Sequence, residues 1–208
     1  MKRLAILGAS GHGKVVADAA LLSGWDEVMF YDDAWPELKT NASWPIVGNT
    51  LTLMESSERI DGIIVAVGNN RIRQEKSQAL RAAGLPLATV IHPSAIVSQF
   101  SSIGEGCFVA ASAVIHVDST IGDYSIINTA AIVEHDCCVG EACHISPGSA
   151  LAGAVRVGHS SWIGINSCVR QLVNIANNVV VGAGSTVIKN VPSGTTVVGN
   201  PAKPLINH

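Results

Sequence analysis

A histidine followed directly by an aspartate, His135-Asp136, is the pair of side chains in this sequence best suited to proton transfer. Imidazole exchanges protons near neutral pH, so histidine is the usual general base there. A neighbouring carboxylate can orient the ring and stabilise the imidazolium, as the acid of a catalytic triad does. The sequence contains seven histidines: His12, His92, His116, His135, His144, His159 and His208. His135 is our candidate for a base because an acid follows it directly.

A glycine-rich segment near the N-terminus, residues 8–14 (GASGHGK), could bind phosphate groups. It leads into an apolar-periodic helix, and the N-terminus of a helix attracts anions. A P-loop would need Ser or Thr after the lysine to hold magnesium, and Val15 stands there. The spacing GxxGxG differs from the dinucleotide fingerprint GxGxxG, although Asp32 lies where a ribose-binding acid would. A dinucleotide, a nucleotide-sugar and a plain tight turn all remain open here.

The C-terminal half repeats with a period of six residues. From Ile91 to Val187, every sixth residue is Ile, Val or Leu, seventeen in succession, and the residue four positions after each is small or Val. This period suits neither an α-helix nor a half-buried strand. It predicts triangular coils of three short strands, in which one aliphatic and one small side chain per face point inward. Equivalent positions then stack three hexads apart at the spacing of paired strands.

This register predicts where the candidate residues lie on the prism. His135 is the third residue of its hexad and is expected to project outward near a corner. Neighbouring residues of a regular strand point apart, so its pairing with Asp136 requires a turn there. His144 lies one and a half hexads further and cannot share a face with His135, so a site using both would be shared between two subunits. Gly153 stacks one coil after His135, where its N–H could donate to an oxyanion.

None of the five cysteines forms a CxxC pair, which argues against a zinc or thioredoxin-like motif. Their odd number, in a protein expected to be cytoplasmic, predicts free thiols. The three at small inward positions are expected to be packing residues, which argues against a covalent intermediate on them: Cys107, Cys137 and Cys143. His116 stacks beside Glu134 in the same register, and the two are expected to pair.

The N-terminal half alternates strands and helices. The expected strands are residues 3–8, Val28–Tyr31 and Gly62–Val67. A helix follows the glycine-rich segment, another follows Asn70 to about Ala83, and residues 34–50 are expected to be loop because they hold two prolines and a glycine. The alternation predicts a small parallel α/β domain of Rossmann type. We therefore divide the chain into a Rossmann-like domain, residues 1–88, and a β-helix domain, residues 89–208.

Composition restricts the function further. Hydrophobic residues make up 48% and charged residues 14% of the chain, which indicates an ordered protein. The net charge of −3 argues against nucleic acid as the main partner. No run of about 18 apolar residues occurs, so no membrane span is expected. The apolar stretch before Gly8 is too short for a secretory signal, which predicts a cytoplasmic protein.

Taken together, these motifs resemble those of a known family. The hexads from residue 91 to about 203, with the closing Val197–Lys203, are similar to the left-handed parallel β-helix of hexapeptide-repeat acyltransferases. The N-terminal signatures are GASGHGKVVAD, Asp32-Asp33 and Gly68-Asn69-Asn70, and the later ones are Asn128-Thr129 and Glu134-His135-Asp136-Cys137. With these, nearly the whole chain resembles bacterial sugar acetyltransferases, in particular the UDP-bacillosamine-type N-acetyltransferases, with sialic acid O-acetyltransferases as relatives.

The resemblance implies a homotrimer that binds acetyl-CoA between neighbouring prisms, needs no metal, and acetylates the 4-amino group of a UDP-linked amino-dideoxy sugar. It implies that His135 removes the proton during direct transfer, with Asp136 beside it. The expected cofactor-binding residues are Asn128, His144, Gly153, Ile165 and Gly182. The expected substrate-binding residues are Gly11, His12, Gly13, Asp32, Asp33, Gly68 and Asn69.

Three other functions compete with this interpretation. The first is O-acetylation of sialic acid or another sugar hydroxyl, since the two groups of enzymes share most motifs. The second is a non-catalytic scaffold, against which the intact His135-Asp136 pair argues. The third is an NAD-dependent enzyme, which would leave the β-helix unexplained.

Overall fold

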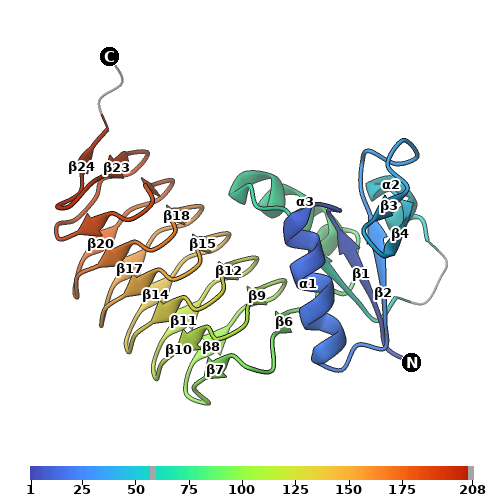
Figure 1. The fold of residues 1–208 in the computed structure, drawn as a ribbon, viewed down its shortest axis with the longest axis horizontal. Coiled ribbons are helices and arrows are strands. Elements are labelled where there is room, and N and C mark those ends of the chain that lie inside the picture. The colour runs from blue at the N-terminus through green and yellow to red at the C-terminus, as the bar shows by residue number, and fades with distance from the viewer. Residues whose placement is uncertain (57–59, 206–208) are drawn as a thin grey trace. The chain divides into compact units, whose positions relative to one another are not determined.

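The computed structural model describes residues 1–56 and 60–205, so His208 lies outside the described part. The chain divides into two compact units, Met1–Pro93 and Ser94–His208, each recognisable in Figure 1 by its own secondary structure. No helix in the described ranges is long and apolar enough to cross a bilayer.

The N-terminal unit is built on a five-stranded sheet of order β3-β4-β2-β1-β5. Its strands are β1 (Arg3–Leu7), β2 (Glu27–Tyr31), β3 (Thr40–Asn41), β4 (Trp44–Gly48) and β5 (Gly62–Val65), and its helices are α1 (Gly11–Leu22), α2 (Thr50–Met54) and α3 (Asn70–Ala82). The short strand β6 (Val90–Ile91) follows them. The central β1 pairs in parallel with both β2 and β5. Its nearly uninterrupted apolar sequence is typical of a parallel strand covered on both faces. The predicted Rossmann-like fold is confirmed.

The expectation that residues 34–50 form a loop is wrong, because they contain β3 and β4. β4 pairs in parallel with β2 through Ile46 and Gly48. Pro45 has no N–H to donate, and the ladder to β2 begins one residue after it. On the other side, Ile46 N donates to Lys39 O at 2.9 Å. The proline therefore interrupts no hydrogen bond between β4 and β2, which is why the prolines misled the prediction.

The C-terminal unit is a β-helix of short strands, mostly of two residues, arranged in three sheets (Figure 1). Its strands pair in parallel except for the last two, which pair antiparallel. One sheet contains β7 (Ile96–Val97), β10 (Val114–Ile115), β13 (Ile132–Val133), β16 (Ala150–Leu151), β19 (Cys168–Val169) and β22 (Thr186–Val187). A second contains β8 (Ser102–Ile103), β11 (Thr120–Ile121), β14 (Cys138–Val139), β17 (Arg156–Val157) and β20 (Asn174–Ile175). The third contains β9 (Phe108–Val109), β12 (Ile126–Ile127), β15 (His144–Ile145), β18 (Trp162–Ile163), β21 (Val180–Val181), β23 (Thr196–Val198) and β24 (Lys203–Pro204). This fold is the one that the hexads predict.

The inward side chains are those that the repeat selects. From Val109 to Val187, every sixth residue is at most 3% exposed. The small inward residues are equally buried, and their polar atoms are satisfied by the backbone. Ser119 Oγ, for example, donates to Glu134 O at 2.7 Å, and Ser149 Oγ donates to Gly164 O at 2.7 Å. A buried hydroxyl without such a partner would destabilise the fold.

Residues with positive φ form the corners between strands. Asp118, Tyr124 and Asp136 have φ values of 58°, 60° and 61°. This left-handed conformation is uncommon outside glycine and turns the chain sharply. The corner at Asp136 is therefore the turn that the His135-Asp136 pairing requires.

Candidate active site

His135 and Asp136 form a hydrogen-bonded pair on the corner between β13 and β14. His135 Nδ1 lies 2.7 Å from Asp136 Oδ2. The two side chains are 58% and 59% exposed, so both face solvent. The left-handed conformation of Asp136 brings the two neighbouring side chains together, which a regular strand could not do.

The surroundings of His135 favour its protonated form. The hydrogen bond from the ring to Asp136 raises the pKa of His135, and the negative charges of Asp136 and Glu134 act in the same direction. A raised pKa makes the neutral imidazole a stronger base. Glu134 Oε1 also lies 3.7 Å from His116 Nε2, which is the pairing that the register of the repeat predicts.

Gly153 lies directly beneath the His135 ring. A Cβ atom on Gly153 would come within 2.6 Å of His135 Cε1 and 2.7 Å of Nε2. The backbones of the two coils are joined here, since Ala154 N donates to His135 O at 2.9 Å. The sequence analysis selected Gly153 because its N–H could donate to an oxyanion. The structure shows in addition that the absence of a side chain there gives the imidazole its space.

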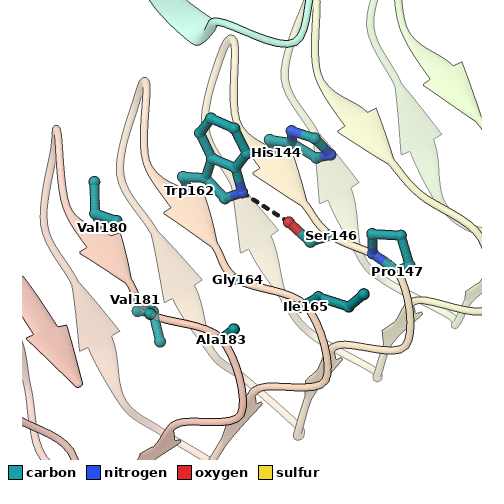
Figure 2. Close-up of a pocket in the computed structure, with 10 residues that line it drawn as sticks. His144, Ser146, Pro147, Trp162, Gly164, Ile165, Val180, Val181 and Ala183 are labelled. Atoms are coloured by element: carbon teal, nitrogen blue, oxygen red, sulfur yellow. Dashed lines mark hydrogen bonds between the residues drawn. The ribbon is translucent and has the colours of Figure 1, made fainter. Parts of the chain in front are cut away.

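An apolar groove of about 490 Å³ lies on the third sheet, along β15, β18 and β21 (Figure 2). Three predicted cofactor-binding residues line it, namely His144, Ile165 and Gly182. Ser146, Pro147 and Trp162 also line it, and sequence reasoning missed them. The repeat could have indicated Trp162, because this residue stacks one coil after His144 in the ladder of β15 and β18.

His144 is held firmly within this groove. It is 8% exposed, and its ring stacks on the Trp162 indole with centroids 4.9 Å apart and planes inclined by 25°. Trp162 Nε1 donates to Ser146 Oγ at 2.7 Å, a bond drawn in Figure 2. The predicted residue Asn128 joins this group, since its Nδ2 lies 3.0 Å from His144 Nε2.

The predicted residues of the β-helix therefore fall into two groups. His135, Asp136 and Gly153 gather at the corner between the sheet of β13 and the sheet of β14. Asn128, His144, Ile165 and Gly182 lie along the third sheet. A corner of a triangular coil is opposite the third side, so one prism cannot bring the two groups together.

In the N-terminal unit, the glycine-rich segment packs against the sheet at the carboxyl ends of its strands. Gly8 has a φ of 115°, which favours glycine, and α1 begins at Gly11. Gly11 has open space beside it, whereas Gly13 is buried and a Cβ there would collide with Gly8 O. Asp32 Oδ2 accepts a hydrogen bond from Ala9 N at 2.7 Å and so holds the segment in place.

Asp33 and Lys76 form an ion pair beside a small cavity of about 110 Å³ that Gly8 and Asp32 also line. Lys76 Nζ lies 2.6 Å from Asp33 Oδ2 and 3.0 Å from Thr50 Oγ1. Partial burial acts to raise the pKa of Asp33, but hydrogen bonds from Lys76 and Thr50 outweigh it and lower the pKa to about 2. Lys76 was missed because its partner is far away in the sequence.

The β5–α3 connection is organised by a buried arginine. Arg73 is 1% exposed, and its Nη1 donates to Val67 O at 2.9 Å and Gly68 O at 3.2 Å. Asn69 caps α3, since its Oδ1 accepts from Ile72 N at 3.1 Å.

Burial, together with the charge of Arg73, lowers the pKa of His12 to about 4. At neutral pH His12 is therefore uncharged.

The described part of the chain also bears on metal binding and on the reactivity of a buried thiol. Residues 1–56 and 60–205 contain no group of three or more His, Cys, Asp or Glu side chains that could hold a metal ion. Burial raises the pKa of Cys137 to about 11, so its thiol stays protonated and is a poor nucleophile.

Comparison with known proteins identifies the family. Residues 3–80 match the PglD N-terminal domain. The acetyltransferase domain of PglB from Neisseria gonorrhoeae, solved with acetyl coenzyme A, is 44% identical with a TM-score of 0.94, and the match covers 98% of this chain and 99% of that one. The chain belongs to the hexapeptide-repeat sugar acetyltransferases. The fold and the sequence resemblance thus agree.

Two other relatives differ in the nucleotide of the sugar with which they are described, which is GDP for one and UDP for the other. Perosamine N-acetyltransferase from Caulobacter crescentus, solved as a His-to-Asn variant with CoA and GDP-perosamine, is 38% identical with a TM-score of 0.95, over 100% of this chain and 98% of that one. UDP-N-acetylbacillosamine N-acetyltransferase of Bacillus subtilis is 36% identical over 116 residues, which is 53% of this chain and 52% of that protein. The match to this curated relative therefore spans about half its length.

Proposed function

We propose that this protein transfers the acetyl group of acetyl-CoA to the 4-amino group of a UDP-linked amino-dideoxy sugar, a step in glycan biosynthesis. The observation that carries the proposal is the exposed His135–Asp136 pair, with its Nδ1–Oδ2 distance of 2.7 Å. An amine must lose a proton when it becomes an amide, and this pair supplies a base accessible to a bound sugar. Relatives that match nearly the whole chain are acetyltransferases, one solved with acetyl coenzyme A and another with CoA and GDP-perosamine.

In the proposed reaction, the sugar amine attacks the thioester carbonyl while His135 Nε2 accepts its proton. Asp136 keeps the ring proton on Nδ1 and stabilises the imidazolium that forms. The tetrahedral intermediate then collapses, the C–S bond breaks, and the proton passes from His135 to the leaving thiolate, so that CoA departs as a thiol. The Gly153 N–H, next to the ring, is the proposed donor to the oxyanion.

The acyl donor is proposed to lie in the groove on the third sheet. A pantetheine chain is long and largely apolar, and Ile165, Gly182 and the Trp162 face offer it an apolar wall. His144 and Asn128 would contact the acetyl end. This assignment rests on the position of His144 in the groove, one coil before Trp162, and on the 3.0 Å contact of Asn128 Nδ2 with His144 Nε2.

The two groups of residues on the prism support a homotrimer. Within one chain the His135 corner and the groove lie on opposite parts of the coil, so a complete site requires the corner of one subunit and the groove of another. The sheet of β7 and β13 also exposes Ile96 and Ile132, which are 66% and 36% exposed, and such apolar surface favours self-association.

The N-terminal unit is proposed to bind the nucleotide part of the sugar. The open side of Gly11 at the start of α1 would accept the diphosphate, with His12, Gly68 and Asn69 nearby. The cavity beside Asp32 and Asp33 lies at the carboxyl ends of the strands, where α/β sheets bind ligands. The free thiols fit a reducing compartment, which supports a cytoplasmic location.

Thiol release from acetyl-CoA tests this proposal. The assay compares a UDP-linked 4-amino sugar, GDP-perosamine, free sialic acid and buffer alone. We expect rapid release with the UDP-linked sugar and none above background with sialic acid or buffer. Faster release with GDP-perosamine would contradict the proposed UDP-linked substrate and indicate a GDP-linked one. Faster release with sialic acid would contradict N-acetylation and indicate O-acetylation.

A further inference from the structure

The groove histidine, His144, makes a hydrogen bond whose direction its neighbours determine. Its Nε2 lies 3.0 Å from Asn128 Nδ2. An amide nitrogen can only donate, so the contact is a hydrogen bond only if Nε2 carries a lone pair. The protonation of His144 therefore depends on which end of the Asn128 amide faces the ring.

The backbone of Thr129 fixes the orientation of that amide. Thr129 N donates to Asn128 Oδ1 at 2.8 Å, and Thr129 Oγ1 lies 3.4 Å from the same oxygen. If the amide were turned over, its NH₂ group would face the Thr129 N–H, and two donors would oppose each other. That arrangement would be repulsive, so Oδ1 faces Thr129 and Nδ2 faces His144.

We infer that Asn128 holds His144 as the Nδ1–H tautomer. With the Asn128 donor opposite, Nε2 supplies the lone pair and the single proton of the neutral ring resides on Nδ1. Trp162 stacks on the ring at 4.9 Å, is itself bonded to Ser146, and holds the plane of the ring. Nδ1 is buried and out of reach of solvent.

This tautomer assigns His144 a role different from that of His135. The Nε2 lone pair of His144 is engaged by Asn128, and its Nδ1 already carries a proton. His144 therefore cannot remove a proton from a substrate. His135, by contrast, has its Nδ1 on Asp136 and its ring exposed. Asn128 is thus a positioning residue that makes His144 a fixed wall of the groove instead of a second base.

Nuclear magnetic resonance of the histidine ring nitrogens tests the inference without any substrate. A long-range proton–nitrogen spectrum of the full-length, ¹⁵N-labelled protein distinguishes protonated from unprotonated ring nitrogens, and a His144→Gln variant identifies the His144 signals. In the wild type at mildly alkaline pH we expect Nε2 to be unprotonated and Nδ1 protonated. A wild-type spectrum with a protonated Nε2 would overturn the inference.

Asn128→Asp provides the second measurement, because it replaces the facing donor with an acceptor of the same shape. We expect the Nε2 resonance to move from the unprotonated to the protonated range. Asn174→Asp adds the same charge on the exposed face of β20, and Thr129→Val keeps the backbone N–H; both should leave the His144 signals in place. An unprotonated Nε2 in Asn128→Asp would also contradict the inference. If that variant does not fold, the wild-type spectrum alone decides.

Discussion

Replacing Asp136 with asparagine should separate the two effects that the carboxylate has on His135. Asparagine has nearly the same shape and tolerates the left-handed φ of 61°, so the corner should keep its conformation. The carboxylate hydrogen bond is the main cause of the raised pKa of His135. Without it, the pKa falls towards the ordinary value, and the imidazole becomes a weaker and less well oriented base.

The sign of the expected change follows from the role of the base. His135 must be neutral to accept a proton, so wild-type activity is lost as the pH falls through the raised pKa. In Asp136→Asn the acidic limb of the kcat/KM profile should move to lower pH, while the plateau falls. Complete removal of a general base costs about 10²–10⁴-fold in rate. We expect that loss for His135→Ala and a smaller loss for Asp136→Asn.

The assay is thiol release from acetyl-CoA, with kcat/KM taken from initial rates at sugar concentrations well below KM across the pH range. Asp118→Asn is the matched control, because Asp118 occupies the equivalent corner one coil earlier with a φ of 58°. Its profile should superimpose on that of the wild type. An acidic limb that stays in place in Asp136→Asn, or moves to higher pH, would refute the reasoning. So would full activity of His135→Ala.

Two further substitutions test close approaches of the backbone. Gly153→Ala would place a Cβ within 2.6 Å of the His135 ring, so we expect the base to be displaced and kcat to fall while the melting temperature barely changes; unaltered kcat would contradict this. Gly13→Ala would place a Cβ against Gly8 O, and overpacking of this kind costs about 1–3 kcal/mol of unfolding free energy. Gly11→Ala, with open space beside it, is the control, and equal urea midpoints for the two variants would disprove the packing argument.

The β-helix was predictable from sequence because each coil repeats the same local requirement. An aliphatic residue at every sixth position and a small residue four further on are needed to fill a triangular core, and this pattern is visible without any long-range information. The corner position of His135 and the burial of Cys137 follow from the same register. Even Trp162 could have been found by stepping one coil forward from His144.

The N-terminal unit was less predictable because its key contacts are irregular. Pro45 suggested a loop, although β4 pairs with β2 only after the proline. The ion pair of Lys76 with Asp33 and the bonds of Arg73 to the β5–α3 connection depend on how distant segments pack. No residue spacing in the sequence predicts such contacts. The orientation of the Asn128 amide was equally hidden, since it depends on a single backbone N–H.

Subunit complementation tests most directly whether the active site combines the His135 corner of one chain with the groove of another. His135→Ala lacks the base, and Ile165→Glu places a charge in the apolar groove at an exposed position. Each variant alone should be inactive yet trimeric. If the two are co-expressed in equal amounts and mix at random, a site is complete only when its corner and its groove both come from intact donors, which predicts roughly a quarter of wild-type activity. Recovery of that activity would support the shared site, and a mixture as inactive as its components would contradict it.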